Sequence, residues 1–257
     1  MSLLAAVAAA VALLAGPADY VAAQQRPDGS FGDPQLTAWS TLALVAAGRD
    51  TGAATARLAE ARPQSETDAA LFALARAAAG EHPADLLPRL RAHRPGTQVN
   101  ATIWTILALR QAGERVPRAH VQGLLRAQRP SGGWSWHAGG AADTNDTAAA
   151  LQALRAAGIR GRAIDRGVAF LRRHQNRDGG FELTGGRGSD SQSTAWAIQG
   201  LLAAGHDPGA PAFRYLQRMR RRDGSYRYNA RYVTTPLWVT AQVLPALVRK
   251  PYPLRRG

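Results

Sequence analysis

The sequence predicts an all-α fold, a closed double ring of six helical hairpins. Three observations predict it. A short phrase of glutamine, three residues, glycine, one residue and an aromatic returns along the chain. Alanine-rich segments with helical spacing recur with it and end in small residues and glycine. No stretch alternates apolar and polar residues as a half-buried strand does. A repeat with this period indicates stacked supersecondary units.

The repeated phrase occurs in three full copies and one weaker copy. The copies are Gln25…Gly29…Phe31, Gln128…Gly132…Trp134, Gln175…Gly179…Phe181 and Arg220…Gly224…Tyr226, the last without the glutamine. In these loops Asp or Ser can bond to local amides while Gly takes a positive φ. The aromatic can then fill the gap between neighbouring hairpins. We expect the loops to be structural staples rather than catalytic elements.

The alanine-rich segments are the predicted inner helices. They are Thr37–Gly48, Thr67–Gly80, Asn100–Gly113, Asn145–Gly158, Gln192–Gly205 and Thr234–Leu247. In the fifth, Ala195, Ile198 and Leu201 follow the spacing of one helix face. Small polar residues suited to an N-cap precede nearly all of them, and glycine suited to a left-handed C-terminus closes five. Units two and three are shortened, because ARPQ at Ala61 and HRPG at His93 replace the glutamine phrase.

The six units, each about 30 to 47 residues long, can close on themselves or stay open. An open solenoid needs polar capping units at both ends. The last inner segment is as apolar as the middle ones, which favours closure of the first unit onto the sixth. An open solenoid is the alternative.

Composition limits the chemistry. The chain of 257 residues has 46% hydrophobic residues, no cysteine and a formal net charge of +14, nearly all from arginine. The charge suggests an anionic surface as partner through the segments Arg218–Arg222 and Arg249–Arg256. The alternative is arginine spread over a solvated outer ring. No nucleic-acid motif or phosphate-binding glycine loop is present, so no nucleic-acid partner is predicted.

The N-terminus is apolar from Leu3 to Ala15, the length of a signal-peptide core and too short to span a bilayer. We predict residues 1–16 as a signal peptide and 17–257 as a single domain of six repeats, secreted or at the cell surface. The missing basic n-region weighs against this. Residues 17–25 read as the first outer helix. The alternative is a cytoplasmic protein that keeps residues 3–25 as a helix kinked at Gly16-Pro17.

The glutamine–glycine–aromatic phrase resembles the QW repeat of squalene–hopene cyclases and related terpene cyclases. The chain resembles the wider group of prenyltransferase and squalene-oxidase repeat proteins, which implies an α6/α6 toroid around a central cavity. The local sequence looks most like that of secreted actinobacterial repeat proteins of unassigned function in three segments, Gln24–Gly32, Asp190–Gly205 and Thr240–Pro253. Fold likeness by itself does not transfer function.

The segment from Asp143 to Thr147 resembles the D-x-D-D-T pattern of class II terpene cyclases. The resemblance implies that the middle acid protonates an alkene or epoxide, but Asn145 stands there and an amide has no useful acidic proton. Asp143 and Asp146, one helical turn apart, are the candidate catalytic residues that could take over. The alternative is that Asp143 caps the loop and that Asn145 or Asp146 caps the helix, as Ser193 or Thr194 would in the next unit. Asp190 there is expected to be another cap.

No metal or cofactor is predicted. The resemblance to protein prenyltransferases would imply zinc held by Asp, Cys and His, and the chain has no cysteine. Its six histidines lack the spacing of a zinc motif.

Four tryptophans are candidate ligand-binding residues. Trp39, Trp104, Trp196 and Trp238 lie nine residues before the closing glycine, or its equivalent, of their inner segments. Equivalent positions predict an aromatic ring around the cavity, suited to an apolar or flat ligand or to a cation. The alternative is packing between the inner and outer rings.

These observations favour an exported, non-catalytic protein that binds a small apolar or flat ligand, an isoprenoid or a corrinoid. One alternative is a class II cyclase-type enzyme with a degenerate D-x-N-D-T motif, although full enzymes of that group are expected to carry two such domains. A purely structural interaction module is the other. An inward-facing acid with a raised pKa at the cavity wall would favour the enzyme.

Overall fold

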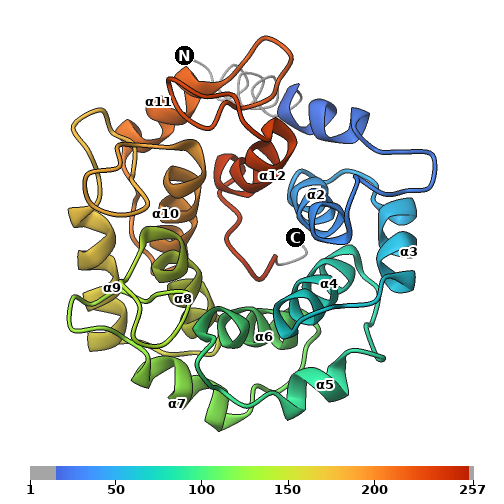
Figure 1. Cartoon of the computed structure of the whole chain (residues 1–257), viewed down its shortest axis with the longest axis horizontal. Helices are drawn as coiled ribbons and strands as arrows, with labels where there is room; N and C mark the ends of the chain where they lie inside the picture. Colours follow the sequence, from blue (N-terminus) through green and yellow to red (C-terminus); the bar gives the residue numbers. More distant parts are fainter. Residues whose placement is uncertain (1–15, 255–257) are drawn as a thin grey trace, which may run out of the picture.

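The computed structural model describes residues 16–254 and shows two concentric rings of helices (Figure 1). The inner ring consists of α2 (Pro34–Ala46), α4 (Glu66–Ala79), α6 (Val99–Gln111), α8 (Thr144–Ala156), α10 (Ser191–Ala203) and α12 (Pro236–Leu247). The outer ring consists of a helix at residues 16–23, α3 (Gly52–Glu60), α5 (Leu87–Ala92), α7 (Arg118–Arg126), α9 (Arg162–Arg173) and α11 (Ala210–Met219). The predicted all-α toroid is confirmed. The predicted signal segment, apart from Gly16, lies outside the described residues.

The inner helices are alanine-rich because they are buried on nearly every side. Each packs against its two neighbours in the ring and against the outer ring. Small side chains let the helix axes approach closely. At Gly200 in α10 the neighbouring helix is so near that no side chain fits. A Cβ added there would lie 2.7 Å from Ala148 Cα of α8. The outer helices bury one face only, as amphipathic surface helices do.

The repeated loops are structural staples, as predicted. Their aromatics are buried, and the backbone amide of each donates to a threonine hydroxyl of the following inner helix. These bonds are Phe31 to Thr37 (3.0 Å), Trp134 to Thr147 (2.9 Å), Phe181 to Thr194 (2.9 Å) and Tyr226 to Thr240 (2.9 Å). The glutamine has a local role, since Gln128 Nε2 donates to the Gly132 carbonyl at 2.8 Å. Gly132 has φ +95°, and a Cβ there would lie 2.6 Å from a carbonyl of α9.

The ring closes. Inner helix α12 packs against α2 as the other inner helices pack against their neighbours, and the two lie side by side in Figure 1. In the outer ring, the loop glycine Gly224 packs against the backbone of Gly16. This contact is equivalent to the contact between Gly132 and α9, so the first outer helix takes the place of a following unit. The open solenoid is therefore excluded.

All six inner helices point the same way, because an outer segment returns the chain between each pair. Their N-termini meet at one opening of the ring and their C-termini at the other. Within residues 16–254, no helix has both the length and the apolar content needed to cross a membrane.

Candidate functional site

A cavity of about 350 Å³ lies at the opening formed by the N-termini of the inner helices. Each inner helix contributes two residues spaced four apart, which therefore lie on one face. The outer tier is Gln35, Thr67, Asn100, Asn145, Gln192 and Trp238, and the inner tier is Trp39, Leu71, Trp104, Ala149, Trp196 and Gln242. Trp136 and Leu183 from the loops and the carboxyls of Asp143 and Asp146 complete the lining. The wall near the opening is thus polar and the deeper wall apolar.

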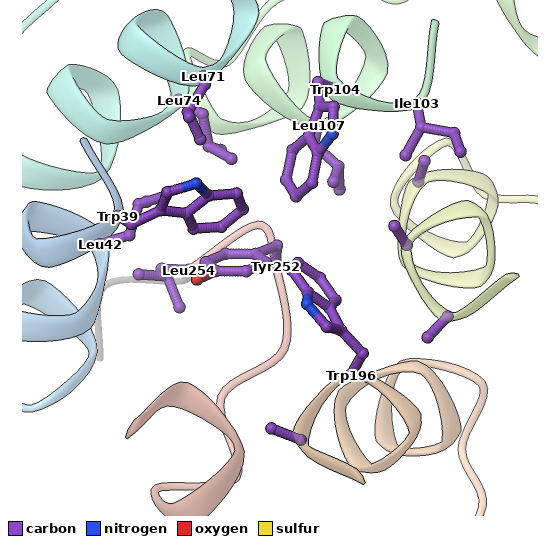
Figure 2. Packing of buried hydrophobic residues seen from close by; sticks show 14 of the residues in the cluster. Trp39, Leu42, Leu71, Leu74, Ile103, Trp104, Leu107, Trp196, Tyr252 and Leu254 are labelled. Atoms are coloured by element: carbon purple, nitrogen blue, oxygen red, sulfur yellow. The ribbon is translucent and has the colours of Figure 1, made fainter. Parts of the chain in front are cut away.

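Three tryptophans close the cavity from below. Trp39 and Trp104 meet edge to face with ring centroids 5.1 Å apart, and Trp196 lies 5.8 and 5.6 Å from them. Figure 2 shows them converging on Tyr252, whose ring lies 6.1 to 6.4 Å from each. The predicted inward orientation is observed for these three, and the alternative of packing between the rings is not. They make a floor rather than a wide ring.

The predicted register of Trp238 is wrong. The Thr240 hydroxyl accepts the Tyr226 amide, as the Thr194 hydroxyl accepts the Phe181 amide, so these two threonines are equivalent. Trp238, two residues before Thr240, is therefore equivalent to Gln192 and lies one turn nearer the opening. Its ring still lies 6.2 Å from that of Trp39. The end of α12 misled the count, because this helix ends at Leu247 and Arg249 (φ +55°) stands where the other inner helices are followed by glycine.

Gln242 occupies the tryptophan register in α12. Its Oε1 accepts hydrogen bonds from Trp196 Nε1 and from Gln192 Nε2, both at 2.8 Å. The amide therefore fixes one tryptophan of the floor and one residue of the outer tier. Asn100, Gln192 and Gln242 were missed from the sequence, although a spacing of four residues from the tryptophans could have found the first two.

Asp143 is a helix cap. Its carboxylate accepts the Asp146 amide at 2.8 Å at the N-terminus of α8. Asp33, Ser65 and Asp190 cap α2, α4 and α10 in the same way. The expected cap at Asp190 is confirmed. The expectation that Asn145 or Asp146 caps the inner helix is wrong, because Asp143 is itself the N-cap of α8. Asp143 nonetheless also lines the cavity.

The Asp143 and Asp146 carboxyls form a coupled pair at the cavity wall. Burial, and then the charge of Asp146, raise the pKa of Asp143 to about 8. Burial also raises the pKa of Asp146, against the hydrogen bond from Asn100 Nδ2 to its Oδ1 at 2.7 Å. Two carboxyls this close do not both ionise readily, and the pKa of about 8 keeps Asp143 protonated at neutral pH. An inward acid with a raised pKa is thus present.

Asn145 stands in the outer tier beside this pair, with its Oδ1 buried and without a hydrogen-bond partner. The amide oxygen accepts hydrogen bonds but supplies no proton. No cluster of His, Asp and Glu suited to a metal ion occurs among the described residues. The arrangement can hold an apolar body over the tryptophans and bond to polar groups near the opening.

Tyr252 was also missed from the sequence. It is fully buried below the tryptophans although it lies only five residues before the C-terminus. The segment Arg249–Leu254 crosses the second opening (Figure 1) and places the Tyr252 side chain inside the ring of helices. Gln152 Oε1 accepts the Tyr252 amide at 2.7 Å, and Gln111 Nε2 donates to the Leu254 carbonyl at 2.8 Å. No local pattern marks such an insertion.

Comparison with known proteins places the chain in a family. Residues 94–244 match the squalene-hopene cyclase C-terminal domain, more than half of the chain, and the chain belongs to this family. No curated protein matched in a comparison of sequences.

Several solved structures share the fold. A protein from Actinoplanes has TM-score 0.69 and 20% identity, over 93% of this chain and 99% of that one. The type II terpene cyclase MstE from Scytonema, in complex with geranylgeranyl dihydroxybenzoate, has TM-score 0.70 and 16% identity over 93% and 98%. The ent-copalyl diphosphate synthase from Streptomyces platensis has TM-score 0.60 and 23% identity, over 84% of this chain but 50% of that one.

These comparisons overturn one expectation. A cyclase of this group was expected to need two helical domains, which weighed against the enzyme. The alignment with this single toroid covers 98% of the MstE chain, so a type II terpene cyclase can have one helical domain of this kind. Chain length therefore no longer separates the two hypotheses.

Proposed function

We propose that this protein binds a compact, mainly apolar ligand of isoprenoid type in the tryptophan-floored cavity, without protonating it at the D-x-N-D-T motif. The cavity itself carries the proposal. Its volume of about 350 Å³ corresponds to about a dozen waters at roughly 30 Å³ each in the liquid. That suits a geranyl or farnesyl group better than a geranylgeranyl conjugate of the kind MstE binds. A corrinoid finds no support, because a corrin macrocycle is much larger.

The chemistry of Asn145 supports binding over catalysis. The related pattern has its proton donor at this position, and an amide cannot supply a proton to an alkene. Asp143 is also occupied by the cap of α8.

Filling the cavity tests the proposal. Ala149 faces the cavity in the inner tier, so Ala149→Leu places a larger side chain in free space. We expect it to reduce the affinity for farnesol at least tenfold by isothermal titration calorimetry, because the ligand and the new side chain compete for the same volume. The matched control is Ala156→Leu, two turns further along α8 at the second opening, which should bind as the unchanged protein does. Absence of farnesol and geraniol binding, or full binding by Ala149→Leu, would overturn the proposal.

The second candidate function is acid-initiated cyclisation, and one observation favours it. Asp143 lines the cavity and holds a proton at neutral pH. Incubation with farnesyl and geranylgeranyl substrates, followed by gas chromatography with mass spectrometry, distinguishes the two functions. We expect the substrates to be recovered unchanged. A cyclic product that disappears in Asp143→Asn, which keeps a capping side chain, would establish the enzyme instead.

Export remains a proposal. It is supported by the apolar run Leu3–Ala15 alone. Intact mass measurement of protein recovered from the culture medium of its host tests it, and recovery of the full chain from the cytoplasm only would contradict it.

A further inference from the structure

The cavity is acidic inside a strongly basic protein. The chain has a formal net charge of +14. The residues that line the cavity nevertheless include two aspartates and no lysine, arginine or histidine. Asp146 is 6% exposed, and the side-chain hydrogen bond it receives comes from a neutral amide. A buried carboxylate is costly without a cationic partner, and none is present among these lining residues.

Two residues that line the same cavity as Asp146 carry buried acceptors without partners. Asn100 is 4% exposed; its Nδ2 donates to Asp146, and its Oδ1 is buried without a partner. The buried Oδ1 of Asn145 also has no partner, on the next inner helix. Buried polar atoms are nearly always hydrogen-bonded in native proteins. The two amide oxygens therefore lack donors, while the Asp146 carboxyl is bonded to neutral groups, the Asn100 amide and the Asp143 carboxyl.

The missing group can be described from these atoms. It must donate several hydrogen bonds, carry positive charge to pair with Asp146, and be attached to an apolar body that covers the floor. A protonated primary amine has three N–H donors and no acceptor, which matches the three acceptor groups. Tryptophan rings also attract ammonium groups through their faces, and Trp104 and Trp238 line the same cavity.

We propose that the cavity selects a ligand with a protonated primary amine on a compact apolar body. The ammonium group lies between Asn100 Oδ1, Asn145 Oδ1 and the Asp146 carboxylate, and the apolar body lies on Trp39, Trp104 and Trp196. This inference rests on the proposed function, because it uses the same cavity. It adds the chemical class of the ligand.

Three probes with related carbon skeletons test it: geranylamine, geraniol and the hydrocarbon myrcene. Each is titrated into the full chain by calorimetry at neutral pH. A hydrogen bond to an ionised group is roughly twice as strong as a neutral one. We therefore expect geranylamine to bind at least about tenfold more tightly than geraniol. The excess of positive charge on the chain disfavours non-specific binding of an amine elsewhere.

Two variants locate the amine. Asp146→Asn removes the charge but keeps an oxygen for Asn100, and should lower the affinity for geranylamine to that for geraniol measured with the same variant. Asp33→Asn, which replaces an exposed cap on α2 that does not line the cavity, is the matched control and should keep the preference. Far-ultraviolet circular dichroism checks that both variants fold.

The outcomes separate the two proposals. Equal binding of the amine and the alcohol, or an amine preference that survives in Asp146→Asn, overturns the inference and leaves the proposed function standing. Binding of none of the three probes overturns both. The comparison in the unchanged protein decides the inference even if Asp146→Asn fails to fold.

Discussion

The two openings of the toroid carry opposite charge. The cavity at the helix N-termini is lined by Asp143 and Asp146 and by no cationic side chain. The second opening, where the inner helices end, holds a cavity of about 780 Å³. Its lining includes Arg110, Arg155, Arg249 and Lys250 and no carboxylate. The same ring of helices thus presents an acidic face and a basic face.

The difference shows that the polarity of the helix ends determines which charge is stabilised at each opening. Six parallel inner helices point their free N–H groups at one opening and their free C=O groups at the other. Asp143 accepts the Asp146 amide at one end of α8. At the other end, Arg155 donates to the Ala203 and Ile159 carbonyls at 3.2 and 2.9 Å. Acids near N-termini and cations near C-termini are both stabilised by the helix dipoles.

Among residues 16–254, a chain segment closes the basic opening and none covers the acidic one. Tyr252 fills the space beneath the tryptophans from the basic side and separates the two cavities. Its ring contacts Trp39, Trp104 and Trp196. Its hydroxyl is buried without a partner, so packing rather than hydrogen bonding holds the ring in place.

Removing this ring is the change with the largest expected effect. Tyr252→Ala should lower the free energy of unfolding by about 3–5 kcal/mol, the range for a buried large aromatic, and should join the two cavities. Tyr252→Phe is the matched control and should change stability by less than about 1 kcal/mol, because it removes only the unpartnered hydroxyl. Urea denaturation followed by tryptophan fluorescence measures both. Equal stability of Tyr252→Ala and the unchanged protein would show that the segment Arg249–Leu254 does not close the ring.

The acidic opening should make the protein less stable as the pH rises. The pKa of Asp143 is raised from its usual 3.8 to about 8, so between these values the folded protein keeps a proton that the unfolded chain releases. The free energy of unfolding therefore falls as pH rises from about 4 to 8. The change is on the order of a few kcal/mol, since each pKa unit is worth about 1.4 kcal/mol. The raised pKa values of Asp146 and Asp190 act in the same direction.

Asp143→Asn tests this dependence. Asparagine caps a helix as well as aspartate does, and it has no proton to lose in this range. Urea denaturation at pH 5, 6, 7 and 8 should therefore show a shallower loss of stability with pH than in the unchanged protein. Asp33→Asn, whose carboxylate is in solvent, is the control. If Asp143→Asn loses stability with pH as steeply as the unchanged protein, the group that holds the proton in the folded state is not Asp143.

Much of the fold could be predicted because its signals are local. The glycine of each loop, the N-cap before the inner helices and the spacing of apolar residues depend on neighbours within one or two turns. The cap at Asp143, the loop staple at Trp134 and the inward position of Trp39 follow from such spacing. Residues within one turn of a tryptophan, such as Asn100 and Gln192, could have been found by the same reasoning.

Sequence alone determined the helices, their caps and their order, since each is set by backbone and side-chain preferences a few residues apart. Tertiary structure decided the rest. Tyr252 reaches Gln152 across 100 residues, and Leu254 reaches Gln111 across 143. The raised pKa of Asp143 arises from burial and from the charge of Asp146. Burial and charge pairing depend on how the ring closes, and closure brings together parts of the chain that no local pattern connects.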